Sequence, residues 1–135
     1  MQSLGLEGRV IFPGFVPDKD KPALLSGALA YVFPSLFEGF GLPVLEAMAC
    51  GTPVLTSNSS SLPEVAGNAA LLVNPHSVDD IARGLTEITT NASLRQRLIE
   101  QGFEQIKKFS WDRAGVEVLE ILGQVAESRG VGSRE

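Results

Sequence analysis

Short apolar runs alternate with amphipathic stretches along the first half of the chain. The runs that fit β-strands cover residues 9–12, 29–33, 53–56 and 70–73. The two middle runs are almost entirely apolar, which is typical of parallel strands that are covered on both faces. Because strands that alternate with helices form parallel sheets, the pattern predicts an α/β fold in which helices flank a parallel sheet.

Helices are predicted both between these strands and beyond the last one. A short helix is expected over residues 22–28 and another over residues 42–50, where Pro43 lies in the first turn and Gly51 follows the end. Beyond the fourth strand the pattern is helical throughout. Two capping-box sequences predict the starts of successive helices there, Ser77-x-x-Asp80 and Ser93-x-x-Gln96.

A further helix is predicted from about Ser110, because apolar residues recur at helical spacing from there on. Trp111 is expected to anchor this helix against the rest of the domain. Residues 128–135 are polar and contain glycine, so they are expected to form a flexible tail. The folded unit is therefore predicted over residues 1–127.

The composition indicates one globular domain. The 135 residues are 44% hydrophobic and 20% charged, which is enough for one core and disfavours disorder. Sixteen acidic residues against 11 basic ones give a net charge of -5, which disfavours nucleic acid and anionic lipid as partners. The single cysteine, Cys50, excludes an internal disulfide, and no secretory signal or spanning apolar run is recognisable. We therefore expect a cytoplasmic protein.

Candidate chemistry lies in the segment between the second predicted strand and the following helix. In a parallel sheet the ligand crevice lies at the carboxyl ends of the strands. Gly39 and Gly41 allow backbone N–H groups to approach a ligand, and the helix that follows directs its positive end to the same place. The pattern fits a phosphate-binding turn. Glycines at such a position can also serve only to make the turn, and that alternative stays open.

Two carboxylates lie on either side of these glycines. Glu38 precedes them, and Glu46 lies on the second turn of the predicted helix, so both can face one crevice. Carboxylates bind pairs of neighbouring hydroxyl groups well. A phosphate flanked by two polyols is what a nucleotide sugar offers. The alternative is that both acids only stabilise the N-terminal part of the helix.

A polar loop at residues 57–61 follows the third predicted strand and borders the same crevice, where Asn58 or Ser59 could touch a ligand. Cys50 is expected to be a small buried side chain, because no nucleophilic constellation accompanies it. Solvated positions are expected for the remaining candidates, His76, Lys19 and Lys21. No cluster of Cys, His or Asp residues has metal-ligand spacing, so no metal site is predicted.

The segment that carries both acids, PSLFEGFGLPVLEAMACGTP, resembles the retaining glycosyltransferases of the family 4 type. Glu38 and Glu46 match the E-x7-E signature, and the segments SSLPEVAG and FSW resemble the C-terminal half of the same enzymes. The resemblance implies the GT-B architecture, in which two Rossmann-like domains face each other across a cleft. The C-terminal domain holds the nucleotide-sugar donor.

The resemblance also implies roles for matching residues. Glu38 would contact the transferred sugar as the catalytic-site carboxylate, and Glu46 would accept hydrogen bonds from the donor ribose. The sugar and phosphates would be lined by the backbone of Gly39, Phe40, Gly41 and Leu42. The backbone near Phe15 and Val16 would abut the nucleobase. No metal and no other cofactor is implied.

By the same resemblance the chain is a truncated C-terminal half of such an enzyme. Two strand–helix units that normally carry an Arg and a Lys for the diphosphate are missing, and Arg9 matches a different strand. The expected partners are the donor and the N-terminal acceptor domain, so the isolated chain is expected to be inactive. Unpaired sheet edges are expected to give a homodimer. A position at the membrane surface stays open for the complete enzyme.

Two other classes of function remain open. The chain could be a non-catalytic module that binds nucleotide sugars or supports assembly. It could also belong to a GT-B-shaped epimerase or phosphorylase, although a phosphorylase would need a lysine-bound pyridoxal cofactor, for which the sequence offers no recognisable context. The E-x7-E spacing argues against both. The nucleobase, the hexose and the acceptor are not predicted.

Overall fold

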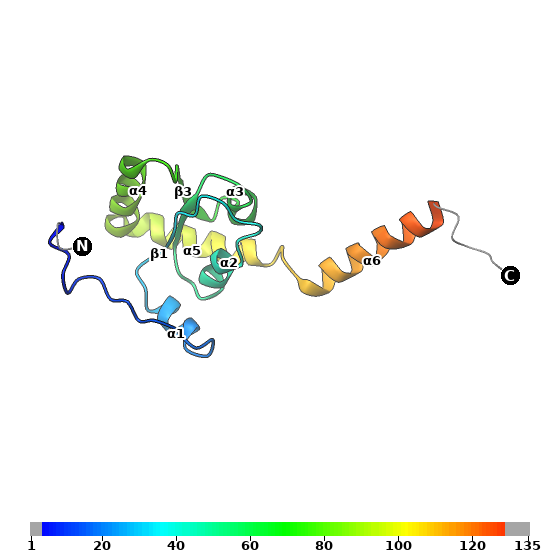
Figure 1. The fold of residues 1–135 in the computed structure, drawn as a ribbon, viewed down its shortest axis with the longest axis horizontal. Coiled ribbons are helices and arrows are strands. Elements are labelled where there is room, and N and C mark those ends of the chain that lie inside the picture. Colours follow the sequence, from blue (N-terminus) through cyan, green and yellow to red (C-terminus); the bar gives the residue numbers. More distant parts are fainter. Residues whose placement is uncertain (1–3, 129–135) are drawn as a thin grey trace.

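The computed structural model describes residues 4–128 and has a parallel sheet at its centre (Figure 1). The strands are β1 (Tyr31–Phe33), β2 (Val54–Ser57) and β3 (Ala70–Val73). The central strand β2 pairs in parallel with both others, so that Leu55 lies opposite Val32 and Leu71. The last three strands predicted from the sequence are therefore confirmed, with ends that shift by at most two residues.

The described residues contain six helices. Their bounds are α1 (Lys21–Ser26), α2 (Leu42–Ala49), α3 (Leu62–Ala66), α4 (Val78–Thr90), α5 (Ala92–Ile106) and α6 (Trp111–Ser128). The two helices predicted between strands correspond to α1 and α2 within two residues. Helix α3 is not predicted by the sequence pattern, because five residues that include a proline are too few to show a helical period.

Apolar side chains cover both faces of the sheet, because successive residues of β2 point to opposite sides. Val54 belongs to one buried cluster together with Met48 of α2 and Leu62 of α3. Leu55 belongs to a second buried cluster, together with Ile88 of α4 and Leu94 of α5. The structure therefore confirms the predicted α/β class, with helices on both sides of a parallel sheet.

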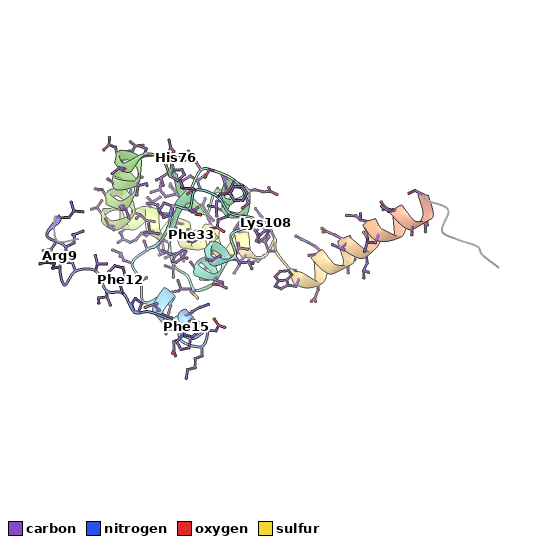
Figure 2. The ribbon with its side chains drawn as sticks, viewed as in Figure 1. Arg9, Phe12, Phe15, Phe33, His76 and Lys108 are labelled. Carbon is purple, nitrogen blue, oxygen red and sulfur yellow. The ribbon has the colours of Figure 1, made fainter. Side chains whose placement is uncertain are left out.

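The prediction of a strand over residues 9–12 is wrong. These residues form an irregular segment in which the Ile11 and Phe12 side chains are 83% and 76% exposed. Figure 2 shows Arg9, Phe12 and Phe15 along this segment, apart from the sheet. A strand needs a hydrogen-bonding neighbour, and none of the described strands pairs with this segment. The homodimer expected from open sheet edges stays a prediction.

The predicted helix starts are half confirmed. Ser77 caps α4, since its side chain accepts a hydrogen bond from the Asp80 N–H. The cap predicted at Ser93 is wrong, because α5 begins at Ala92 and its cap lies two residues before Ser93. Its cap is Asn91, whose side-chain oxygen accepts a hydrogen bond from the Leu94 N–H at 2.9 Å. Asparagine is as good a cap as serine, so the earlier position prevails.

Helix α6 extends away from the sheet and its covering helices (Figure 1). None of its residues is buried, and the Trp111 side chain is 81% exposed. The predicted anchoring role of Trp111 is therefore wrong, because the apolar residues of α6 meet no core within the described chain. The tail predicted over residues 128–135 lies outside the described residues, except for Ser128, which ends α6. Among residues 4–128, no helix is both long enough and apolar enough to span a membrane.

Gly84 allows α4 to approach the sheet closely, and we predict that Gly84→Ala destabilises the domain. A Cβ at this position would lie 2.6 Å from Val73 Cγ1 and 2.9 Å from Leu55 Cδ1, both in the buried core. Overpacking costs about 1 to 3 kcal/mol, whereas the helix gains about 1 kcal/mol from alanine. Urea unfolding should therefore show a net loss of up to about 2 kcal/mol.

Gly115→Ala is the matched control, because a Cβ there would meet nothing within 4 Å. This variant should not lower the free energy of unfolding. Equal losses for the two glycines would contradict the assignment of the effect to the contact between α4 and the sheet.

Candidate functional site

Two loops leave the same edge of the sheet, because β1 and β2 run parallel. Residues 34–41 connect the carboxyl end of β1 to α2, and residues 58–61 connect the carboxyl end of β2 to α3. This edge is where a parallel sheet places its ligand crevice. Both predicted carboxylates belong to the first connection or to the helix that it enters.

The two glycines of the first loop have different structural roles. Gly41 has a φ of 112°, and a Cβ on it would lie 2.8 Å from the Leu62 side chain of α3. Glycine is therefore required there by the turn itself. Gly39 has no atom within 4 Å of its Cβ position, so the space beside it is open. The alternative that the glycines only make the turn accordingly holds for Gly41 but does not account for Gly39.

The first turn of α2 lacks a side-chain cap. Gly41 occupies the capping position and offers no side-chain hydrogen bond, and Pro43 contributes no N–H group. The Val44 N–H is directed back to the Gly41 carbonyl at 3.0 Å. The first turn of α2 also contains no acidic side chain, so the positive end of the helix dipole is not neutralised from within the helix.

Glu38 and Glu46 both act on Tyr31, which begins β1. The pKa of the Tyr31 hydroxyl is raised above its ordinary value, first by burial, then by the negative charge of Glu46 and then by that of Glu38. The two carboxylates therefore lie within electrostatic range of one half-buried side chain at the sheet. Glu46 itself is exposed on α2, whereas Glu38 is partly buried in the loop.

A hollow of about 600 Å³ adjoins this region, between α2 and the start of α6. Among the predicted site residues, its lining includes Phe40, Leu42 and Glu46. The opposite wall comes from the end of α5 and the first turns of α6, including Trp111 and Arg113. The Phe40 ring packs edge-on against Phe109, with ring centroids 5.8 Å apart.

The structure does not bring every predicted residue to that hollow. Its lining lacks Glu38, Gly39 and Gly41, which lie in the adjoining loop. Val16 is partly buried in the irregular segment before α1, and it is likewise absent from the lining. Its predicted contact with a nucleobase stays a prediction.

Hydroxyl groups of β2 hold the end of β1 and the loop that follows it. The Thr56 hydroxyl donates a hydrogen bond to the Phe33 carbonyl at 2.8 Å, and the Ser57 hydroxyl donates one to the Ser35 carbonyl at 2.5 Å. Both β2 residues are fully buried. A buried hydroxyl needs a partner, so these bonds fix the loop to the sheet.

Two further serines, which were not among the predicted site residues, contact the loop around Glu38. The Ser61 hydroxyl lies 3.0 Å from the Glu38 carbonyl and 2.7 Å from the Phe40 carbonyl. The Ser60 hydroxyl accepts a hydrogen bond from the Glu38 N–H at 3.1 Å. Ser60 has a φ of 52°, a left-handed conformation that costs a non-glycine residue about 1 to 2 kcal/mol. The run of serines directly after a buried strand was the signal in the sequence.

The other candidates have ordinary surroundings. Cys50 is the C-cap of α2, and it is half-buried, so the prediction of a buried side chain is wrong. His76 is exposed, as predicted. Lys21 forms an exposed ion pair with Asp18 at 2.6 Å, and the pKa of Lys21 is raised mainly by that partner. Asn58 is exposed, and the Ser59 hydroxyl lies 3.4 Å from the Leu36 carbonyl. The ligand contact predicted for Asn58 or Ser59 stays a prediction.

Residues 4–128 contain no group of three or more His, Cys, Asp or Glu side chains placed to hold a metal ion. The expectation that the reaction needs no metal or other cofactor stays a prediction. A second hollow, of about 370 Å³, is lined by Asn68 and by polar residues of α5 and its end. None of the predicted site residues borders it.

Comparison with known proteins connects this geometry to one sequence family. Residues 1–105 match the family described as "Glycosyl transferases group 1". "O-antigen chain mannosyltransferase B" from Escherichia coli is 43% identical over 113 residues, which are 84% of this chain and 30% of that protein. "Serotype-specific mannosyltransferase WbdA" from Escherichia coli is 46% identical over 128 residues, which are 94% of this chain and 16% of that protein. The chain thus spans less than a third of these relatives.

The fold is also similar to a solved structure. "Sucrose-phosphate synthase (tll1590)" from Thermosynechococcus elongatus superposes with a TM-score of 0.82 and 29% sequence identity. The similarity covers 94% of this chain and 33% of the solved one. The arrangement of sheet and helices therefore occurs as one part of a larger protein.

We predict that removal of the Glu46 charge lowers the pKa of Tyr31. Tyr31 is the single tyrosine of the chain, so ultraviolet absorbance of the tyrosinate reports it directly. Glu46→Gln should shift the titration down toward the ordinary value of about 10, and Glu38→Gln should shift it less, since Glu46 is the larger of the two charge effects. Glu87→Gln, an exposed change on α4, is the control and should leave the titration unchanged.

The same titration should affect stability at alkaline pH. The raised pKa means that the folded chain keeps the Tyr31 proton after the unfolded chain has lost it. The stability that the folded chain gains from keeping Tyr31 protonated is fully present below about pH 10, the pKa of tyrosine in the unfolded chain. It is lost as the pH rises through the pKa of Tyr31 in the folded chain. An unchanged Tyr31 titration in Glu46→Gln would contradict the effect of the Glu46 charge on the Tyr31 pKa.

Proposed function

Because this chain belongs to the glycosyl transferases group 1 family, we propose that it is the nucleotide-sugar-binding part of a retaining glycosyltransferase. The complete enzyme would transfer a hexosyl group from a nucleoside-diphosphate sugar to an acceptor hydroxyl. The observation that carries the proposal is the pair of carboxylates, Glu38 and Glu46, on either side of a glycine turn at the start of α2. Mannosyltransferases among the relatives support polysaccharide synthesis as the setting.

The two carboxylates would bind the two polyol parts of the donor. Glu46 would accept hydrogen bonds from the ribose hydroxyls, and Glu38 would accept them from the transferred sugar. Both carboxylates are near enough to Tyr31 to raise the pKa of its hydroxyl, which supports their lying near each other. Carboxylates make charge-assisted hydrogen bonds that are about twice as strong as neutral ones, so they suit ligands that present vicinal hydroxyls.

The diphosphate would lie over the glycine turn. The open space beside Gly39 allows close approach of backbone N–H groups, and the uncapped first turn of α2 directs its positive end to the same region. An eight-residue helix suffices for this effect, because it is concentrated in the first turn. Phe40 and Leu42 would contribute backbone and apolar contacts beside it.

The reaction breaks the bond between the anomeric carbon of the sugar and the diphosphate oxygen. Negative charge then develops on the departing nucleoside diphosphate, and the fixed positive end of α2 stabilises that charge. The acceptor hydroxyl forms the new bond on the same face that the diphosphate leaves and gives its proton to the departing diphosphate oxygen, so the anomeric configuration is retained. Glu38 in this scheme orients the sugar rather than attacking it.

The remaining parts of the site would come from outside these 135 residues. The relatives are more than three times as long as the matched segment, which supports a separate acceptor-binding domain as the partner of this chain. An Arg and a Lys from preceding strand–helix units would add positive charge at the diphosphate. In their absence the chain would bind a nucleotide sugar only weakly.

We predict that Glu46→Ala weakens donor binding about tenfold to a hundredfold in the complete enzyme. Loss of a hydrogen bond to a charged group costs about 1.5 to 3 kcal/mol, which corresponds to that range of affinity. Calorimetric titration with GDP-mannose and UDP-glucose measures the effect. Glu87→Ala, an exposed substitution on α4, is the matched control. An unchanged dissociation constant for Glu46→Ala would contradict the ribose assignment.

We also predict that this chain alone transfers no sugar. The 135 residues span less than a third of the relatives, so we expect the acceptor-binding domain and the basic pair to lie outside them. A radiolabelled donor assay with GDP-mannose or UDP-glucose and a polyol acceptor tests this, with the complete enzyme as the positive control. Labelled glycoside formed by the 135-residue chain would refute the prediction.

A further inference from the structure

We propose that Ser60 and Ser61 are positioning residues that set the orientation of Glu38 toward the transferred sugar. The inference rests on the proposed function, because it assigns a role within the same donor site. Neither serine has to touch the donor. Both act through the main chain of the loop that carries the carboxylate.

Both main-chain groups of Glu38 form hydrogen bonds to the loop at residues 58–61. Its N–H donates to the Ser60 hydroxyl at 3.1 Å, and its carbonyl lies 3.0 Å from the Ser61 hydroxyl. The Ser61 hydroxyl also reaches the Phe40 carbonyl at 2.7 Å, so its single proton is shared between two carbonyls. The peptide units on both sides of Glu38 and the one after Phe40 are therefore fixed from α3's side of the crevice.

The backbone of Ser60 is consistent with such a role. Its φ of 52° lies in the left-handed region that favours glycine, and it is the non-glycine residue with positive φ among residues 4–128. In this conformation its hydroxyl accepts the Glu38 N–H. Glycine would adopt the same backbone without strain but could not supply this acceptor. A strained residue that is held by its surroundings is often part of a functional loop.

The inference predicts different effects at the two ends of the donor. Glu46 belongs to α2 and is held by the hydrogen bonds of that helix, so the serines do not orient it. Glu38 lies in a loop without regular structure, and its main chain depends on the serines. Loss of a serine should therefore impair the step in which the sugar is transferred, while binding of the nucleoside diphosphate persists.

The experiment compares Ser61→Ala with Ser61→Thr, which keeps a hydroxyl, in the complete enzyme that carries this chain. Turnover is measured with GDP-mannose and UDP-glucose, and the affinities for GDP and UDP are measured by calorimetry. Ser61→Ala should lower kcat about tenfold to a hundredfold, since a displacement of about 1 Å at a reacting group has that effect. Its affinity for the nucleoside diphosphate should stay within about twofold, and Ser61→Thr should restore most of kcat. Ser93→Ala, an exposed change on α5, is the control.

A second variant tests the geometry without reference to turnover. Ser60→Gly keeps the left-handed backbone but removes the acceptor for the Glu38 N–H. Hydrogen exchange of that amide should become at least tenfold faster than in the wild type, while the melting temperature does not fall. This measurement keeps the inference open to refutation if Ser61→Ala does not fold.

The outcomes distinguish failure of the proposed function from failure of the positioning role of the serines. A wild-type enzyme that binds neither GDP-mannose nor UDP-glucose nor any other nucleoside-diphosphate hexose refutes the proposed function, and with it this inference. A wild type that turns over while Ser61→Ala keeps full kcat refutes the inference alone. The inference is also refuted if Ser61→Ala lowers nucleoside-diphosphate affinity and thermal stability together with kcat and Ser61→Thr does not restore them. An unchanged exchange rate of the Glu38 amide in Ser60→Gly refutes it as well.

Discussion

Strand β2 pairs with β1 and β3 at once, and all four of its residues are fully buried. Its first two residues, Val54 and Leu55, are apolar and supply one side chain to each core cluster. Its last two, Thr56 and Ser57, are polar and bury their hydroxyls against carbonyls at the end of β1 and just beyond it. A buried hydroxyl without a partner costs free energy, so the change from apolar to polar side chains within one strand determines where the next loop can lie.

This constraint connects the core to the site. The loop that the β2 hydroxyls hold carries Glu38 and Gly39 and then enters α2 through Gly41. Leu62 of α3 packs so close to Gly41 that no larger residue fits, so α2 and α3 are fixed relative to each other at the crevice. The chemistry proposed for the two carboxylates thus depends on packing at positions that do not contact a ligand.

The sequence predicted the sheet and α2 well, because buried parallel strands and a proline–glycine pair at helix ends are strong local signals. The predictions failed where an element depends on packing or pairing with another part of the chain. The β-rich residues 9–12 have no strand beside them, and Trp111 has no core to anchor on within the described chain. Ser93 and Asn91 are two residues apart and are similarly good caps, so local propensity does not decide which of them begins α5. The carboxylates were identified from the motif, whereas the contacts of Ser60 and Ser61 depend on a loop conformation that only the structure reveals.

The position of Trp111 gives the molecule an intrinsic optical probe. It is the single tryptophan of the chain, it is mostly exposed, and it lines the same hollow as Glu46. An indole in contact with water emits at long wavelength, and a ligand that displaces this water would shift the emission to the blue or quench it by stacking. Fluorescence of the unlabelled protein can therefore report occupancy of this hollow in real time, independently of any turnover.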